Sequence, residues 1–338
     1  MNGRAIFASI VQGMKTPQFI QLHHEDGSQI RTELLKGLQA TKAYTSPKYL
    51  YDALGSKLFE AITELLEYYP TRTEAAIFLE HAESMVSHIP HGSVLVDLGA
   101  GNCQKAARLF KQLHPSRYVA VDISVDFLKE AMTRLQYQHP DLDMVGVGMD
   151  FAESLALPNE ALEGMAPRVF FYPGSSIGNF TPAEALTFLR AAHTGCGLHE
   201  GRSDKSGLLI GVDLVKGTAE LEAAYDDALG VTAAFNRNML LYINRLIGSN
   251  FNISDWSHVA LYNEEISRIE MHLEAKRDVA LRWTGGERSF VKGERIHTEN
   301  SYKWTTQSFS ELLMQAGFAQ PVVWTDADGK FAVMWATA

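Results

Sequence analysis

Cysteine is scarce in this chain: only Cys103 and Cys196 occur in 338 residues. Two thiols without a CxxC pair build no disulfide framework, and such usage is typical of a protein from a reducing compartment. The scarcity also removes the usual Cys and His spacings of a zinc site, and the adjacent His23 and His24 have no further ligands beside them. The sequence therefore predicts no metal site.

Long apolar runs are missing as well. The first apolar stretch, AIFASIV, is short, and Gln12 and Lys15 follow it without the small-residue cleavage pattern of a signal peptide. No segment reaches the length of a membrane span. We therefore expect a cytoplasmic protein with no membrane partner.

Basic residues are outnumbered by acidic ones. The 30 Lys and Arg against 40 Asp and Glu give a formal net charge of −10. Binding to a nucleic-acid backbone needs a Lys/Arg surface that releases counterions, and no basic run offsets the deficit locally. The sequence predicts no nucleic-acid partner, and no obligate protein partner is evident in it.

Core-forming residues, by contrast, are plentiful. Hydrophobic residues make up 46% of the chain, which is ordinary for a globular protein of one large domain or two. From Ser93 to about Val215, strand-like and helix-like runs alternate, and this alternation predicts a parallel, doubly wound α/β sheet. Near the C-terminus, FSELLMQAGF, VVWTD and FAVMWATA predict a helix and two strands that return to that sheet.

The most informative stretch is VLVDLGAGNCQK, residues 94–105. An apolar β-type run leads directly into Gly99 and Gly101, which allow a sharp turn and a close approach of a ligand to the backbone. The dinucleotide-binding fingerprint requires a third glycine, but Gln104 stands at that position, so the motif alone is weak evidence for nucleotide binding. The stretch predicts a candidate nucleotide-binding turn.

Three further predicted strands end in residues suited to an adenosine ligand. Asp122 ends RYVAVD, 21 residues beyond Gly101, where a carboxylate can accept hydrogen bonds from both ribose hydroxyls. Asp150 and Phe151 end MVGVGMDF and suit the edge and the face of an adenine. The strand VFFYP runs into the polar turn GSSIGNF. Helix capping explains one such aspartate, but four successive strand ends of this kind favour a ligand site.

Segments outside the alternation predict a second, smaller unit. Residues 31–66 have helical spacing; Pro70 is expected to end the preceding element, and Thr71 with Glu74 could form the capping box of the next helix. After DLVKG, two helices and several antiparallel strands are expected, with a hairpin at Gly285 and Gly286. Tyr68 and Tyr69, taken alone, read as core aromatics.

Nearly the whole chain from about Tyr51 resembles a known family. The matching segments are YDALGSKLFEAIT, EYYPTRTE, DLGAGNCQK, PGSSIGNF, DLVKG, AYDDALGVTAAFNRN, RIEMHL and TENSYKW. They are similar to the S-adenosylmethionine-dependent histidine Nα-methyltransferases of ergothioneine biosynthesis, whose relatives include fungal N-methyltransferases acting on prenylated tryptophan. The resemblance implies a Rossmann-like class I methyltransferase sheet with a smaller α+β substrate-binding domain. It implies iterative methylation of L-histidine to trimethylhistidine (hercynine), the first step of ergothioneine biosynthesis.

The resemblance also implies the roles of individual residues. The S-adenosyl-L-methionine site would comprise Tyr68, Gly99, Gly101, Lys105, Asp122, Asp150 and Phe151. Tyr51 and Tyr68 are expected beside the reacting amine, which moves Tyr68 from the core to the catalytic group. The substrate site would comprise Phe59, Gly174, Asn179, Tyr225, Met271, Glu299 and Ser301. In it, Glu299 and Ser301 are expected to hold an imidazole, whereas Tyr68, Asn179 and Tyr225 would bind the α-carboxylate.

The sequence departs from the family pattern in a few places, with DLGAG for ELGSG, MDF for GDF and LLEYYPTR for LPEYYPTR. These changes lie beside the cofactor or in packing positions. The expected domains are 72–215, completed by 302–338, for the cofactor, and 1–71 with 216–301 for the substrate. The alternatives are a methyltransferase for tryptophan or prenylated tryptophan, a nicotinamide-dependent oxidoreductase, and a non-catalytic binding protein on the same fold.

Overall fold

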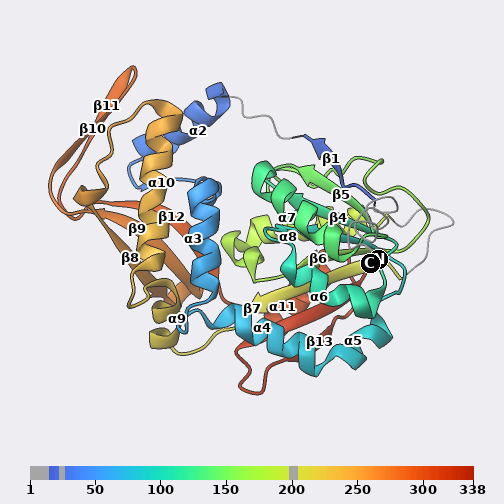
Figure 1. Cartoon of the computed structure of the whole chain (residues 1–338). Coiled ribbons are helices and arrows are strands. Elements are labelled where there is room, and N and C mark those ends of the chain that lie inside the picture. Colours follow the sequence, from blue (N-terminus) through green and yellow to red (C-terminus); the bar gives the residue numbers. More distant parts are fainter. Residues whose placement is uncertain (1–14, 23–26, 198–204) are drawn as a thin grey trace, which may run out of the picture.

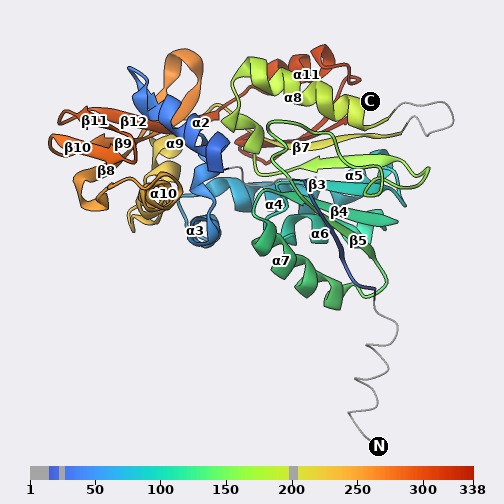
Figure 2. The ribbon, with the colours of Figure 1, turned by 90° about the horizontal axis from the view of Figure 1, so that it is seen from above.

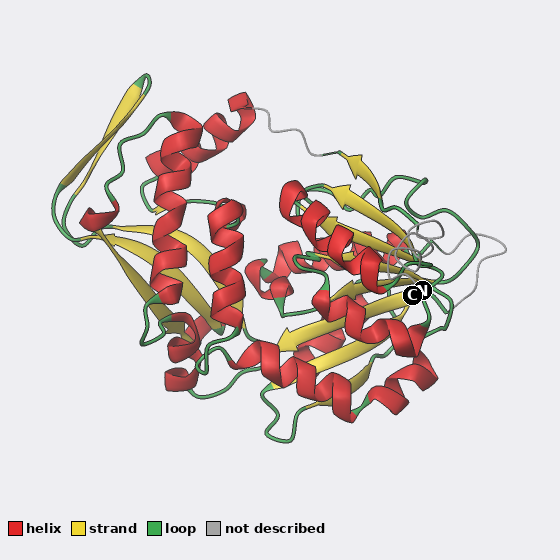
Figure 3. Ribbon diagram, viewed as in Figure 1, coloured by secondary structure: helices red, strands yellow, loops and turns green. Residues whose placement is uncertain are grey.

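The computed structural model describes residues 15–22, 27–197 and 205–338, and this part of the chain forms two units with separate sheets (Figure 1). The larger unit is built on an eight-stranded sheet, and the smaller on a four-stranded sheet with an additional two-stranded hairpin. Figure 3 shows helices packed around the strands of both units. The predicted α/β class with a smaller α+β unit is confirmed.

The large sheet has the strand order β1-β5-β4-β3-β6-β7-β14-β13. Its strands run parallel from β1 to β7, whereas β14 is antiparallel to β7 and β13 is antiparallel to β14. The bounds are β1 Gln18–Gln21, β3 Val94–Leu98, β4 Arg117–Asp122, β5 Asp143–Gly148, β6 Arg168–Tyr172, β7 Gly207–Asp213, β13 Val322–Thr325 and β14 Phe331–Thr337.

Helices cover both faces of this sheet, which explains why β3, β6 and β7 read as continuous apolar runs. In Figure 2, α8 and α11 lie on one side of the sheet, and α6 and α7 lie on the other. The buried side chains divide into two clusters in the same way, with α4 and α5 joining the side of α6 and α7. The bounds are α4 Tyr69–Glu80, α5 Ala82–His88, α6 Gln104–Leu113, α7 Val125–Gln138, α8 Pro182–Gly195 and α11 Thr306–Gln315.

The strand order places the candidate ligand site at one point of the sheet. From β3 the chain proceeds outward through β4 and β5, and then crosses back to β6 and β7 on the other side of β3. The direction of winding reverses between β3 and β6, and ligands of open α/β sheets bind at the carboxyl ends of the strands beside such a reversal. The turns after β3 and β6 are therefore neighbours, although they are far apart in sequence.

The smaller unit has a four-stranded sheet of order β2-β12-β9-β8. Its core is a cluster of buried side chains from this sheet, the hairpin and the helices around them, and α10 packs on both α3 and β8. The predicted pair of helices after DLVKG and the hairpin at Gly285 are confirmed. The bounds are α2 Gly27–Gln39, β2 Ala43–Tyr44, η1 Pro47–Leu50, α3 Ala53–Thr63, α9 Thr218–Tyr225, α10 Val231–Ile247, η3 Ile253–Asp255, β8 Trp256–Asn263, η4 Glu264–Ile266, β9 Arg268–Ala275, β10 Val279–Trp283, β11 Gly286–Phe290 and β12 Arg295–Tyr302.

The structure differs from the expected domain bounds at one strand. β1 lies at the edge of the large sheet, with Gln18 paired in parallel with Val145, whereas residues 1–71 were assigned to the substrate domain. The segment FIQLH predicts a short strand here, but three of the four residues of β1 are exposed, so the sequence does not show which sheet the strand joins. The other bounds stay a prediction. Within the described ranges, no helix has the length and apolarity needed to cross a bilayer.

Candidate active site

The glycine turn after β3 approaches the end of β4 directly. Gly99 and Gly101 both have positive φ angles, 70° and 52°, which an ordinary side chain strains to adopt. The N–H groups of Gly99 and Ala100 donate to the carbonyl of Val121, at 2.9 and 3.0 Å. The turn then enters α6 at Gln104. A rim of backbone without side chains results at the carboxyl end of the sheet.

Asp122 is bound to this turn. Its Oδ2 accepts the Gly101 N–H at 2.9 Å and its Oδ1 accepts the Ser124 N–H at 2.8 Å. Burial raises the pKa of the Asp122 carboxyl, while these backbone donors oppose the shift. Because each carboxylate oxygen has a second lone pair, both can still accept a hydroxyl hydrogen. The geometry therefore suits a vicinal diol such as a ribose.

Asp150 and Phe151 stand at the end of the next strand, β5. A Cβ placed on Gly99 would lie 3.6 Å from the Phe151 ring, so the ring borders the glycine turn directly. The Asp150 carboxylate faces the Lys48 ammonium at 3.4 Å, and Lys48 comes from η1 in the smaller unit. An apolar ring thus borders the glycine turn, an acid follows the strand that pairs with β4, and the smaller unit reaches the same edge of the sheet.

Lys105, which is half-buried, belongs to a network around the buried Glu74 that sequence reasoning did not find. Its ammonium contacts Glu74 Oε2 at 2.8 Å, and Glu74 Oε1 accepts the Gly174 N–H at 2.7 Å. α4 starts at Tyr69 with Pro70 in its first turn, so the capping box at Thr71 was wrong. Glu74 instead points inward, 1% exposed, and joins α4, α6 and the turn after β6.

The remaining predicted residues meet in one cavity between the two units. All nine residues assigned to the amine or to the amino acid line it: Tyr51, Phe59, Tyr68, Gly174, Asn179, Tyr225, Met271, Glu299 and Ser301. Phe235 and Thr232 of α10 line it too, although neither was predicted. The residues come from elements spread over more than two thirds of the sequence. Only the docking of the smaller unit on the sheet rim brings them together.

One wall of this cavity is aromatic. The Tyr51 ring lies edge-on to Phe59 and Phe235, with centroids 5.7 and 5.5 Å apart, and Tyr68 lies 6.2 Å from both Phe59 and Tyr225. Burial raises the pKa of the Tyr51 and Tyr68 phenols well above the usual value. Both are therefore neutral at physiological pH, able to donate or accept a hydrogen bond but unable to act as phenolate bases.

The opposite end of the cavity is polar. The 3₁₀ turn η2, Ser176–Asn179, packs against β12; a Cβ on Gly178 would lie 2.9 Å from the carbonyl oxygen of Tyr302, so only glycine allows this approach. Asn179 Nδ2 consequently donates to Glu299 Oε1 at 3.1 Å. Burial raises the pKa of Glu299 to about 7, although Asn179 and Lys303 favour its ionised form.

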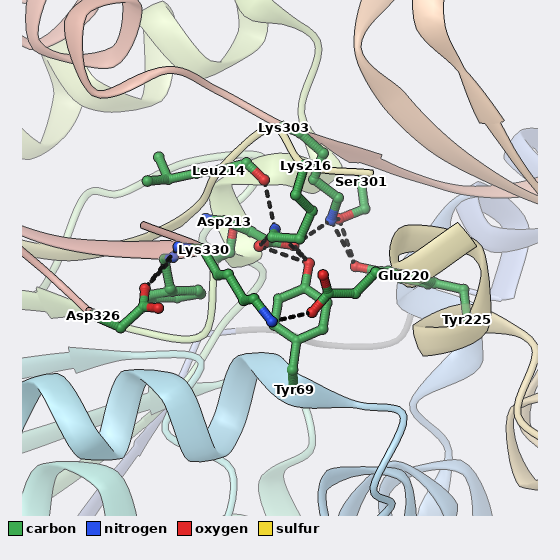
Figure 4. Close-up of polar contacts among 12 residues, drawn as sticks. Tyr69, Asp213, Leu214, Lys216, Glu220, Tyr225, Ser301, Lys303, Asp326 and Lys330 are labelled. Carbon is green, nitrogen blue, oxygen red and sulfur yellow. Dashed lines mark hydrogen bonds and ion pairs between the residues drawn. The ribbon is translucent and has the colours of Figure 1, made fainter. Parts of the chain in front are cut away.

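A buried ion cluster supports this polar end (Figure 4). Asp213, at the end of β7, accepts the Tyr69 hydroxyl and contacts the Lys216 and Lys303 ammonium groups at 2.6 and 2.7 Å. Burial alone would raise the pKa of Asp213, but the two ammonium groups hold it below its usual range.

Lys303 connects the cluster to the cavity. Its ammonium donates to Ser301 Oγ at 2.8 Å and to the Tyr225 hydroxyl at 3.1 Å, and the Tyr225 hydroxyl donates to Ser301 Oγ at 2.7 Å. Sequence reasoning missed Asp213 and Lys303, although both stand in matched segments, DLVKG and TENSYKW. The sequence of these two segments does not show that Asp213 and Lys303 contact each other.

A glycine turn bound to a strand-end aspartate lies at the reversal point of the parallel sheet, and a cavity with aromatic and polar walls lies beside it. These features are typical of an enzyme that uses a nucleotide cofactor. The particular family follows from comparison with known proteins. Residues 30–338 match the family model described as "Histidine-specific methyltransferase, SAM-dependent", and the chain belongs to this family. It is an S-adenosylmethionine-dependent methyltransferase.

Three relatives illustrate the range of similar proteins. Histidine N-alpha-methyltransferase of Mycolicibacterium smegmatis is 36% identical over 90% of this chain and 93% of its own length. Ergothioneine biosynthesis protein 1 of Neurospora crassa is 32% identical over 82% of this chain, which spans 31% of that longer protein. N-methyltransferase imqF of Aspergillus flavus is 29% identical over 88% of this chain and 82% of its own.

Proposed function

We propose that this protein transfers methyl groups from S-adenosylmethionine to the α-amino nitrogen of L-histidine until the trimethylated amino acid, hercynine, is formed, as the first step of ergothioneine biosynthesis. The observation that carries the proposal is the single cavity that joins an aromatic wall to the buried pair Glu299 and Ser301 beside the cofactor rim. Membership of the histidine-specific family supports it. The two buried, unpaired cysteines are in keeping with action in the cytoplasm.

The rim residues fit the cofactor. Asp122 would accept the two ribose hydroxyls, Asp150 and Phe151 would flank the adenine, and the Cβ-free turn at Gly99 and Gly101 would let the ligand lie against the backbone. Next to the cavity, the Lys105 ammonium contacts Glu74, and Glu74 accepts the N–H of Gly174, so these residues border the rim on that side. S-adenosylmethionine supplies an electrophilic methyl group on a sulfonium centre, so the chain needs no covalent nucleophile.

The amino acid would lie with its amine toward the aromatic wall. A free amino acid carries a protonated amine at neutral pH, and each transfer needs the nitrogen lone pair. Because the phenols of Tyr51 and Tyr68 are neutral, we infer that they position the amine and that its proton leaves through water, without a strong protein base. Faces of aromatic rings tolerate the fixed positive charge of a trimethylated product.

The groups proposed to bind the carboxylate of histidine form hydrogen bonds with the groups proposed to bind its ring. Asn179 bonds Glu299, and Tyr225 bonds Ser301. We propose that histidine replaces these contacts, with its carboxylate on Asn179, Tyr225 and Tyr68 and its ring between Glu299 and Ser301. The Lys303 ammonium beside Tyr225 adds positive charge where the carboxylate would lie. Tryptophan fits less well, because its indole has one ring nitrogen, so an N–H given to Glu299 leaves Ser301 without a second ring nitrogen to bind.

A methyl-transfer assay against each proteinogenic amino acid, read by mass, tests the function. We expect histidine to be the preferred acceptor and its dominant product to carry three added methyl groups. A product that stops at one methyl group would contradict the repeated transfer, and faster reaction with tryptophan would contradict the histidine assignment. Absence of any transfer would favour a binding protein.

The raised pKa of Glu299 makes the stability of the free protein depend on pH. The carboxyl is harder to ionise in the folded chain, where its pKa is about 7, than in the unfolded chain, where it is 4.5. Its contribution to folding is therefore fully present below about pH 4.5 and is lost as the pH rises toward 7. Relative to Glu299→Gln, which cannot titrate, we expect the wild type to lose about 2–3 kcal/mol of unfolding free energy from about pH 5 to about pH 8.

Denaturant unfolding of both proteins across this range measures the difference. The comparison cancels other titrating groups, such as Asp97, whose pKa burial also raises to about 7. If the two stability curves stay parallel over the whole range, Glu299 does not have the raised pKa.

A further inference from the structure

The small sheet carries a second group of functional side chains on the face opposite the cavity. In β9, Met271 lines the cavity, and side chains alternate along a strand, so Glu270 and His272 point to the other face. In β12, Glu299 pairs with Met271 and His297 pairs with His272, with a register shift between His297 and Glu299. The bulge turns Glu299 toward the cavity and leaves His297 on the far face, directly beside His272.

These three side chains form a compact group. The His272 and His297 rings are stacked, with centroids 4.9 Å apart and planes at 27°. His272 Nε2 lies 3.1 Å from Glu270 Oε2. One ligand atom from each residue can be chosen so that all lie within 4.8 Å of one another, and within the described residues this is the group that meets such a test. The group opens onto a hollow of about 740 Å³ lined by β9, β12 and residues 41–44.

The three side chains are of the kinds that bind a metal ion. Two imidazoles and one carboxylate offer ligand atoms that lie within 4.8 Å of one another.

Neighbouring contacts leave ligand atoms available. Arg268 binds Glu270 Oε1 at 2.6 Å, so Oε2 remains directed at His272. His272 Nε2 faces this oxygen at 3.1 Å and is the ligand atom of its ring, while Nδ1 is buried without a hydrogen-bond partner. His297 Nε2 contacts the Glu299 carbonyl at 3.0 Å, a contact to backbone of the kind that orients metal-bound histidines.

We propose that Glu270, His272 and His297 bind one divalent transition-metal ion of the zinc type, with solvent from the hollow completing the coordination. Two imidazoles and a carboxylate suit a borderline metal such as Zn²⁺, with bonds of about 2.0–2.2 Å. Ligand atoms around such an ion lie roughly 3.3 Å apart. The Glu270 to His272 separation already has that size, and His297 closes on the ion by side-chain rotation. The ion lies behind the substrate face of the same two strands and takes no part in methyl transfer.

The test uses the full chain without a purification tag, after treatment with a chelator. Zn²⁺ is titrated against a chromophoric competitor, and Co²⁺ is followed by its visible absorption. We expect one equivalent of Zn²⁺ to bind with micromolar or tighter affinity, and Co²⁺ to give the intense bands of a low-coordinate His and carboxylate site. Zn²⁺ should also raise the unfolding temperature, because it binds the native state preferentially.

Two double variants localise the site. His272→Ala with His297→Ala should lower Zn²⁺ affinity at least tenfold, while unchanged S-adenosylhomocysteine affinity shows that the fold is kept. His91→Ala with His114→Ala removes another stacked pair of histidine rings, whose centroids are 6.2 Å apart, and should leave Zn²⁺ binding unchanged. An equal loss of Zn²⁺ affinity in both double variants, or failure of the wild type to bind Zn²⁺ with micromolar affinity, would overturn the proposal. Should the first variant not fold, weak octahedral Co²⁺ absorption in the wild type would overturn it equally.

Discussion

Glu299→Ala is expected to weaken binding of L-histidine by roughly 10- to 100-fold, because a hydrogen bond to a charged group is worth about 1.5–3 kcal/mol when it is lost. Glu299 is buried, and within the described part of the chain its side chain accepts one hydrogen bond, from Asn179, so the second carboxylate oxygen is available to a ring N–H. A buried acceptor that recognises a polar ring also discriminates against ligands that lack the donor. The loss should therefore be specific to histidine.

Calorimetry with histidine and with S-adenosylhomocysteine separates this effect from a general loss of structure. Affinity for S-adenosylhomocysteine should be unchanged, since Asp122 and the glycine turn lie outside the cavity that Glu299 lines. Glu265→Ala is the matched control, because Glu265 is an exposed glutamate of the same unit. Unaltered histidine affinity in Glu299→Ala would show that the ring binds elsewhere.

Lys303→Met is expected to destabilise the protein by about 3–5 kcal/mol, because removing one partner of a buried ion pair leaves uncompensated buried charge or unpaired polar groups. The Lys303 side chain is fully buried, and its ammonium contacts Asp213, Ser301 and Tyr225. Lys216 still faces Asp213 in the variant, so the carboxylate stays ionised but loses one of its two positively charged partners. Histidine affinity should fall as well, because Ser301 and Tyr225 lose a common donor.

Denaturant unfolding of the wild type, Lys303→Met, Asp213→Asn and the double variant measures the coupling. The double variant should be less destabilised than the sum of the single ones, as expected for residues that contact each other. Lys330→Met, which breaks a solvent-exposed pair with Glu220, serves as the control and should change stability little. Additive effects of the two buried substitutions would contradict the ion cluster.

The cofactor rim was the part of the site most open to prediction from sequence. Gly99, Gly101, Asp122 and Asp150 all stand at strand ends, and parallel strands place their carboxyl ends along one edge. The local strand pattern and the rule that parallel strands share one carboxyl edge are thus enough to predict that these four residues lie near one another. Glu74 shows the limit of local pattern, because its spacing from Thr71 suggested a cap, whereas tertiary packing turned it inward to Lys105.

By itself the sequence determined the α/β class, the strand-end rim and, through long matching segments, the residues that line the cavity between the two units. These features depend on the periodicity of apolar residues, on the positions of glycines and on residues that are close together in the sequence. Only the tertiary structure decided that Asp213 and Lys303 meet, that β1 joins the large sheet, and that Glu270, His272 and His297 share one face. Each of these depends on how segments far apart in the chain pack or pair, and a one-residue bulge such as that before Glu299 decides which face a side chain occupies.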